Sequence, residues 1–145
     1  MKIKKLGLAL ALTVWGSALS IGMARAADDP LYQDMGGKDH LSKIANDATD
    51  NFLADDRIKA TFDNTNMDRF RAKLSEQFCA VAGGPCTYTG HSIEAAHKGL
   101  HLRNSDFNAV VEDLQKAMDK DGVPFATQNR FLARLAPMQH AIVTK

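Results

Sequence analysis

The sequence predicts an all-α fold made of one domain, and two observations lead to that prediction. Apolar residues recur every three to four positions in several stretches between residues 38 and 142, which is the spacing of a helix with one buried face. No run of alternating β-branched residues occurs, so nothing in the sequence indicates a strand. Glycine and proline separate the apolar stretches. We therefore expect five or so helices packed around one modest core.

Residues 1–26 have the composition of a secretory signal peptide. Three lysines in the first five residues precede the apolar stretch 6–23, and Ala24-Arg25-Ala26 matches a signal-peptidase cleavage pattern. We expect cleavage after Ala26, a mature domain over 27–145, and a location in the periplasm or outside the cell, with no membrane association. A membrane anchor is the competing interpretation, and the cleavage pattern makes it the weaker one.

The charge of the expected mature domain argues against nucleic acid as a partner. The whole chain carries 18 Lys and Arg against 17 Asp and Glu. Residues 1–26 hold four of the basic residues and none of the acidic ones, so residues 27–145 carry 14 against 17, a formal net charge of −3. Nucleic-acid-binding domains are basic, and this one is not.

Two long helices are predicted in the first half of the domain. Residues 27–37 are expected to form a loop, and a helix then runs from about Lys38 to Ala54. Its apolar face consists of Leu41, Ile44, Ala48 and Phe52. Residues 55–66 form a short helical turn and a corner, and Asn64, Thr65 and Asn66 supply capping groups. The next helix runs from about Met67 to Ala82 and is stopped by Gly83-Gly84-Pro85. Its apolar face consists of Met67, Phe70, Leu74, Phe78 and Val81.

Three further helices are predicted in the second half. A short one carries His97, with Ile93 and Leu100 at the same helical spacing, and Gly99 interrupts it. Ser105 is the expected N-cap of a helix that ends at Gly122. Its apolar residues are Phe107, Val110, Val111, Leu114 and Met118. The last helix begins near Pro124 and has a buried stripe of Phe131, Leu132, Leu135, Met138 and Ile142.

His97 occupies a position where an apolar core residue is expected. A core histidine with one hydrogen bond is the simplest interpretation. However, its helix is very short, and the preceding long helix is rich in Phe and Met. Glu94 precedes it by three residues and His101 follows it by four, but Gly99 interrupts the helix between His97 and His101, which argues against a closed zinc site. One imidazole facing an apolar cavity is the arrangement that a haem iron needs.

Two cysteines, Cys79 and Cys86, remain after removal of residues 1–26. An even count in an exported chain suggests a disulfide, whereas C-x6-C lacks the second ligand pair of a metal site. By chain-entropy arguments such a short bridge contributes about 2 to 3 kcal/mol. Cys79 as a small buried hydrophobic residue is the alternative.

Several short motifs in order point to one family. They are "LYQDMGG" (31–37), "FLADDRIKATF" (52–62), "NTNMDRF" (64–70), "GGPCTYTG" (83–90), "AAHKGL" (95–100) and "GVP" (122–124). Each is weak alone, but together and at this spacing they are specific. Over essentially the whole of residues 27–145, the sequence resembles the group I truncated haemoglobins.

The resemblance implies a two-over-two helical sandwich around haem b. His97 would be the proximal iron ligand, Phe62 would pack on the porphyrin, and residues 83–90 would bring the His97 helix under the haem. Further expected haem contacts are Met67, Phe70, Leu74, Phe107 and Val111. Candidate donors to the propionates are Arg71, Lys73, Thr65, Asn66 and Tyr88. No C-x-x-C-H motif occurs, so the haem is expected to be non-covalent.

The distal side departs from the usual pattern of the family. Members of group I usually carry a tyrosine on the first long helix and a glutamine on the distal helix, which hydrogen-bond to bound O2. Thr49 stands at the tyrosine position, Phe70 at the usual gate position and Leu74 at the glutamine position. The distal pocket is therefore expected to be unusually apolar, with Thr49 and Gln77 as its polar groups, and O2 is expected to be held weakly.

Three functions follow from these expectations. The leading one is a haem protein that binds O2, NO or CO, supplied with electrons by an unidentified reductase. By resemblance it could carry NO dioxygenase or weak peroxidase activity. The second is electron transfer, in which Lys73 loses its proton and occupies the sixth iron position. The third is a cofactor-free helical adaptor in which His97 is a core residue.

Overall fold

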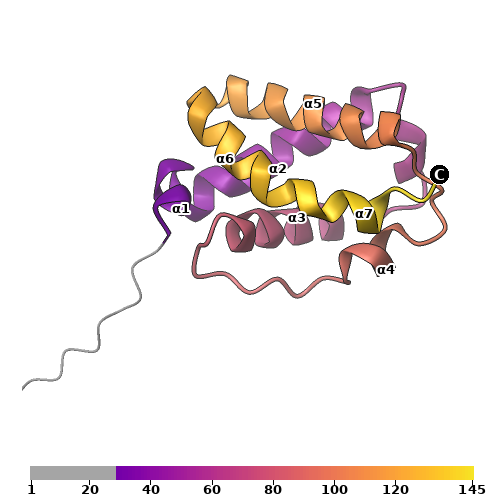
Figure 1. Ribbon diagram of the computed structural model, residues 1–145, viewed down its shortest axis with the longest axis horizontal. Coiled ribbons are helices and arrows are strands. Elements are labelled where there is room, and N and C mark those ends of the chain that lie inside the picture. Colours follow the sequence, from indigo (N-terminus) through magenta and orange to yellow (C-terminus); the bar gives the residue numbers. More distant parts are fainter. Residues whose placement is uncertain (1–28) are drawn as a thin grey trace, which may run out of the picture.

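The computed structural model describes residues 29–145, and the named elements among these residues are all helices (Figure 1). The α-helices are α1 (Pro30–Asp34), α2 (Gly37–Ala54), α3 (Met67–Val81), α4 (Ile93–His97), α5 (Asn104–Lys120), α6 (Phe125–Leu135) and α7 (Gln139–Ile142). Two 3-10 helices complete the set, η1 (Lys59–Phe62) and η2 (Ala136–Met138). The all-α prediction is confirmed. The expected signal peptide and its cleavage site lie outside the described residues.

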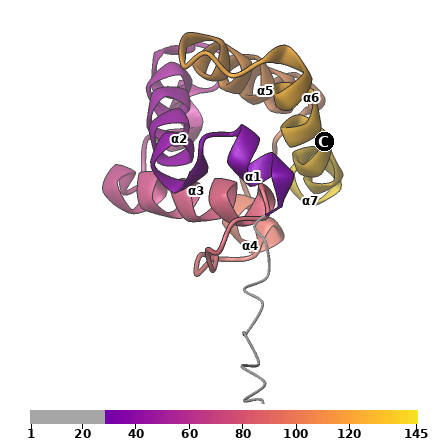
Figure 2. The ribbon, with the colours of Figure 1, turned by 90° about the vertical axis from the view of Figure 1, so that its left-hand side faces the viewer.

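The four long helices, α2, α3, α5 and α6, pack around the core. Figure 2 shows α2 and α3 meeting at one corner, α5 packed across the other end of α2, and α6 on the side opposite α2. α1 lies across the near end and contacts both α2 and α6. α4 contacts α7, the last helix of the chain. No helix within residues 29–145 is long and apolar enough to cross a membrane.

α2 forms the centre of the core, as its apolar spacing predicts. Leu41, Ile44 and Ala48 are fully buried and Phe52 is 3% exposed, because α2 packs against both α3 and α5. Burying each large apolar side chain stabilises the fold by about 1.5–3 kcal/mol. α2 begins after Gly36, whose φ of +81° is the left-handed conformation that favours glycine.

The expectation of a loop over residues 27–37 was wrong, because a short helix, α1, lies within it. Asp29 caps this helix by accepting a hydrogen bond from the Leu31 amide at 2.9 Å. Pro30 follows at the first helical position, where its missing N–H leaves no donor unsatisfied. An Asp-Pro pair before apolar residues is a start signal that the sequence does contain.

Two helix boundaries in the second half also differ from expectation. Ser105 does not cap α5, which begins one residue earlier, at Asn104. The Asp106 carboxylate accepts a hydrogen bond from the Arg103 amide at 2.9 Å and so satisfies the N-terminal end. The last helix is not continuous: α6 ends at Leu135 and η2 and α7 follow. Pro137 explains this break, because proline lacks the N–H that an α-helix needs there.

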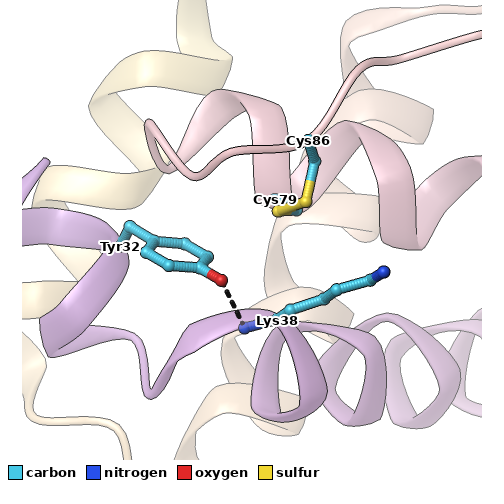
Figure 3. Close-up of a disulfide and its surroundings, with 4 residues drawn as sticks. All are labelled: Tyr32, Lys38, Cys79 and Cys86. Carbon is cyan, nitrogen blue, oxygen red and sulfur yellow. Dashed lines mark hydrogen bonds between the residues drawn. A yellow bond between two sulfur atoms is a disulfide. The ribbon is translucent and has the colours of Figure 1, made fainter. Parts of the chain in front are cut away.

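The expected disulfide is present between Cys79, near the end of α3, and Cys86 (Figure 3). The two Cα atoms lie 5.8 Å apart, within the usual range for a disulfide. Gly84 lies between them in close contact: a Cβ atom there would come within 2.4 Å of the Tyr32 ring and 2.9 Å of the Cys79 sulfur. A side chain at position 84 would therefore disturb both α1 and the disulfide.

Candidate functional site

A cavity of about 570 Å³ lies between α3, α4, α5 and the α6–α7 region. Its walls are mostly apolar and contain five of the chain's phenylalanines. These are Phe52, Phe62, Phe70, Phe78 and Phe107. Cofactor sites in proteins have this size and this apolar character. A second cavity of about 220 Å³ adjoins it and shares Phe62 and His97.

The cavity explains why two predicted apolar stripes are only half-buried. On α3, Phe70 and Leu74 are partly exposed, and on the α6–α7 side so are Leu135 and Met138. All four line the cavity. Phe70 and Leu74 were expected as haem contacts, and Leu135 and Met138 only as part of a buried stripe. All four form apolar surface that faces an internal space, and such surface marks a binding site.

His97, at the end of α4, lines both cavities. Its Nδ1 atom lies 2.6 Å from the Ile93 carbonyl oxygen. A carbonyl only accepts, so Nδ1 must carry the proton, and in the neutral imidazole the lone pair is then on Nε2. The ring is thus oriented by its own helix and retains one nitrogen able to bind a metal. The expected helical stripe of Ile93, His97 and Leu100 ends at His97, because α4 stops there; Leu100 lies beyond it and is 42% exposed.

Three phenylalanines form one cluster on the α2–α3 side of the cavity. The ring of Phe62 in η1 stacks on Phe52 at a centroid distance of 6.0 Å and meets Phe70 edge-on at 5.4 Å. Phe62 lines both cavities. The cluster fixes the position of the Phe62 ring, since its neighbours on two helices hold it from two directions.

A polar cluster of Lys73, Glu76 and Thr89 stands beside the cavity. The Lys73 ammonium donates to Glu76 at 2.7 Å and to the Thr89 hydroxyl at 2.5 Å, and the Thr89 amide donates to Glu76 at 3.0 Å. These contacts lower the pKa of Glu76 from 4.5 to about 2. The hydrogen bond from the Lys73 ammonium has the largest effect, followed by those from the Thr89 amide and hydroxyl. Lys73 lines the cavity, but its charged end is engaged by Glu76.

Three carboxylates with lowered pKa values predict that the folded protein loses stability in acid. The pKa values of Glu76, Asp55 and Asp47 are each lowered to about 2, by Lys73, Arg57 and Lys120 respectively as the first causes. A lowered folded-state pKa contributes stability that is full above the unfolded-state pKa and is lost as pH falls through the folded-state value. We therefore expect the urea midpoint to fall as pH drops from about 5 to about 2.

The Glu76→Gln variant tests the local part of this prediction. It removes one of the three titrating groups, so its urea midpoint should depend less steeply on pH below about 4.5 than that of the unaltered protein. The comparison is a series of urea titrations at fixed ionic strength. Identical pH profiles for the two proteins would contradict the assignment of Glu76.

The structure brings most of the predicted site residues to the cavity. Among the expected contacts, those that line it are His97, Phe62, Phe70, Leu74, Phe107, Val111, Lys73, Tyr88, Thr65 and Asn66. Tyr88 donates its hydroxyl proton to the His91 carbonyl at 2.8 Å. This hydrogen bond fixes the Tyr88 ring within the segment that leads into α4.

Three predicted residues do not line the cavity. Thr49 is fully buried within α2 and donates its hydroxyl to the Ala45 carbonyl at 2.7 Å. Arg71 points to α2, where it donates to the Asn46 carbonyl at 2.9 Å and to Asp50 at 2.5 Å. Met67 is half-buried at the start of α3 and is also absent from the lining. The helical spacing of a residue predicts which face of the helix it occupies, but it does not predict which partner a polar side chain on that face will contact.

Other lining residues were not predicted as site residues. They include Arg69, His91, Asn108, Leu132, Leu135, Ala136, Met138 and Ile142. Arg69 directly precedes Phe70 on α3, and Leu132, Leu135, Met138 and Ile142 belong to the apolar stripe that was assigned to the core. Gln77, named as a polar candidate, lines the cavity and donates to the Met138 sulfur at 3.5 Å.

No group of three or more His, Cys, Asp or Glu side chains within residues 29–145 could hold a metal ion by itself.

The comparisons with known proteins agree with this geometry. A family model for bacterial-like globins matches residues 30–144. The group 1 truncated haemoglobin of Mycolicibacterium paratuberculosis is 32% identical over 120 residues, covering 83% of this chain and 88% of that protein. The chain belongs to the group 1 truncated haemoglobins. Its all-α fold is the truncated globin fold.

Solved truncated haemoglobins have the same fold as this one. The crystal structure of the truncated haemoglobin from Tetrahymena pyriformis in the Fe(III) form superposes with a TM-score of 0.77 at 29% identity, covering 79% of this chain and 98% of that one. A haemoglobin from a Synechococcus species, with covalently attached haem, gives a TM-score of 0.73 at 21% identity over the same shares and supports the fold alone. As a globin, this chain is a haem-binding protein whose general role is ligand binding.

Proposed function

We propose that this truncated haemoglobin is an exported protein that binds O2, NO or CO at a haem iron held by His97. The observation that carries the proposal is the orientation of that imidazole. Its Nδ1 proton is donated to the Ile93 carbonyl at 2.6 Å, and the ring lines the apolar cavity. Haem iron held by one imidazole keeps a second axial position for a diatomic ligand.

The residues present fit a haem. The apolar walls suit the porphyrin, and the cavity volume of about 570 Å³ is within the range of cofactor sites. Phe62, held by Phe52 and Phe70, offers an aromatic ring to pack on it. Arg69 and Lys73 line the same cavity and carry N–H donors for the propionates, whereas the Tyr88 hydroxyl proton is donated to the His91 carbonyl.

The side of the cavity formed by α3 offers little to hold a polarised ligand. Leu74, at the position where the family usually has a glutamine, is apolar, and so is Phe70 at the usual gate position. Thr49 uses its hydroxyl on the Ala45 carbonyl, and Gln77 donates to the Met138 sulfur. These contacts support a distal pocket without a strong donor. They favour fast O2 release over O2 storage.

The structure also supports ligand binding over the electron-transfer alternative. For Lys73 to occupy the sixth iron position it must leave Glu76 and Thr89 and lose its proton. Separating a half-buried ion pair is costly, and deprotonation adds to that cost. The ferrous protein should therefore show a five-coordinate spectrum, whereas a sharp low-spin spectrum would favour Lys73 ligation.

A periplasmic location and non-covalent haem complete the proposal. Expression of the full chain, followed by N-terminal sequencing of the periplasmic protein, should give Ala27 as the first residue. Acidified butanone should extract the haem completely, in contrast to the covalent haem of the Synechococcus protein. Haem that stays with the protein under these conditions would contradict the non-covalent assignment, and an intact N-terminus would contradict the export.

Replacing Phe62 by alanine should loosen the haem without abolishing its binding. The substitution removes an aromatic ring from the cavity wall while His97 remains, and the lost packing amounts to about 3 kcal/mol. Phe125→Ala is a matched control, since Phe125 is 71% exposed and lies outside the cavity. Transfer of haem to an excess of apomyoglobin measures the effect. Equal transfer rates for both variants would show that Phe62 does not contact the haem.

A further inference from the structure

The segment 82–92, which connects α3 to α4, carries Cys86 and leads directly to the helix that bears His97. It contains no helix or strand. Side-chain exposure alternates along it: Pro85, Thr87 and Thr89 are exposed, whereas the residues between them are half-buried. Of these inward residues, Tyr88 and Gly90 line the cavity. The connecting segment is thus one wall of the haem site.

Beyond Gly84, two attachments hold the connecting segment to α3 in the part of the chain that the structure describes. One is the Cys79–Cys86 disulfide. The other is the Glu76 cluster, in which Thr89 donates its amide at 3.0 Å and its hydroxyl at 2.9 Å. The hydrogen bonds that Gly83 and Gly84 make to Ala80 and Cys79 only close the end of α3. The disulfide is the one covalent attachment of the two.

The position of His97 depends on this segment. α4 is only five residues long, and a helix of that length is not stable by itself. It is held by its contact with α7 and by the connecting segment that precedes it. If the segment moves away from α3, the cavity wall opens, and His97 moves with it. Local opening of this kind is governed by the attachments of the segment rather than by the whole core.

We infer that the Cys79–Cys86 disulfide controls how firmly the protein retains its haem, so that a dithiol reductant accelerates haem loss. The inference rests on the proposed function, since it takes His97 as the iron ligand. The bridge excludes the open arrangements in which Cys86 leaves α3 and so lowers the population of the open cavity. The Glu76 cluster alone then limits opening once the bridge is reduced.

The chemical step is thiol–disulfide exchange with a dithiol. Cys79 is 1% exposed whereas Cys86 is half-buried, so the attacking thiolate reaches the Cys86 sulfur. The sulfur–sulfur bond breaks, Cys79 leaves as a thiolate and takes a proton, and a mixed disulfide joins the reductant to Cys86. The second thiolate of the dithiol then displaces Cys86. The protein gains two electrons and two protons, and the reductant becomes a cyclic disulfide.

The test compares haem transfer to excess apomyoglobin for the oxidised holoprotein and for the Cys79→Ser/Cys86→Ser double variant, both without reductant. Transfer from the double variant should be about tenfold faster. Dithiothreitol should accelerate transfer from the unaltered protein to a similar extent and should have no effect on the double variant. Adding Glu76→Gln should accelerate transfer more in the double variant than in the oxidised protein, because it removes the remaining attachment.

Ile44→Val is the matched control, because Ile44 is fully buried in α2 and does not line the cavity. It should lower the thermal midpoint with little change in haem transfer. Equal transfer rates for the oxidised protein and the double variant would overturn the inference. An equally large acceleration by Ile44→Val would also overturn it, because the disulfide would then act only by stabilising the whole fold. A folded protein that takes up no haem in any form would instead contradict the proposed function.

Discussion

Replacing His97 by alanine should abolish stable haem binding while leaving the helical fold intact. His97 is half-exposed on the cavity wall, and the rest of α4 contributes no buried residue, so the loss of its side chain costs the core little. The same change removes the only imidazole whose Nδ1 is fixed by a backbone carbonyl beside the cavity, among the residues described. Haem occupancy after reconstitution, measured from the Soret band against protein concentration, should fall to near zero.

His91→Ala is the matched control for this variant. His91 also lines the cavity but is exposed, and its backbone carbonyl, which the substitution preserves, is what accepts the Tyr88 hydroxyl. It should bind haem to the same occupancy as the unaltered protein, with an unchanged Soret maximum. If His97→Ala retained haem and His91→Ala lost it, His91 rather than His97 would be the iron ligand. Helical circular dichroism of both variants confirms that the fold is intact.

Replacing Leu74 by glutamine should slow O2 release by about tenfold or more. Leu74 is an apolar side chain of α3 that lines the cavity, and glutamine has nearly the same length but adds a donor. A hydrogen bond to a partially charged group contributes about 1.5–3 kcal/mol, and each 1.4 kcal/mol corresponds to about a factor of ten. The dissociation of CO, which depends less on a donor, should change much less. Stopped-flow replacement of O2 by CO measures the rate.

Leu74→Met supplies the control for shape, because methionine fills similar space without a donor. Its O2 release should remain close to that of the unaltered protein. Slow O2 release from the unaltered protein would show that a donor already acts in the pocket, and Gln77→Leu would then test the first candidate. Thr49→Tyr is not an equivalent way to add a donor, since Thr49 lies behind the cavity wall with its hydroxyl on Ala45.

The long helices could be predicted from the sequence because their apolar spacing reflects a physical requirement. α2 shows this best: Leu41, Ile44, Ala48 and Phe52 recur at helical spacing, and all four are buried. The start of α3 was also predictable, because Asn66 caps it by accepting a hydrogen bond from the Arg69 amide at 2.9 Å. Such signals are local, so the neighbouring residues alone determine them.

Short helices and interruptions were less predictable, although their signals are present. α1 follows an Asp-Pro start and the break after α6 contains Pro137, and both are local features that compete with a strong apolar pattern nearby. The apolar stripe of α3 was predicted to contact the haem, whereas the stripe of α6–α7 was predicted only as buried and not as a cavity wall. Spacing identifies a buried face without telling whether protein or a cofactor covers it.

The sequence by itself determined the fold class, the family, the pairing of Cys79 with Cys86 as the available cysteines, and His97 as the histidine on an apolar helical face. Only the tertiary structure decided where the polar side chains point. Arg71 turns to Asp50 on α2, and Lys73 turns to Glu76 beside the cavity, although both belong to the same helix. The reason is that a charged side chain follows the partners that packing brings near it. Asp50 and Thr89 are distant in the sequence from Arg71 and Lys73, whereas Glu76 is only three residues from Lys73.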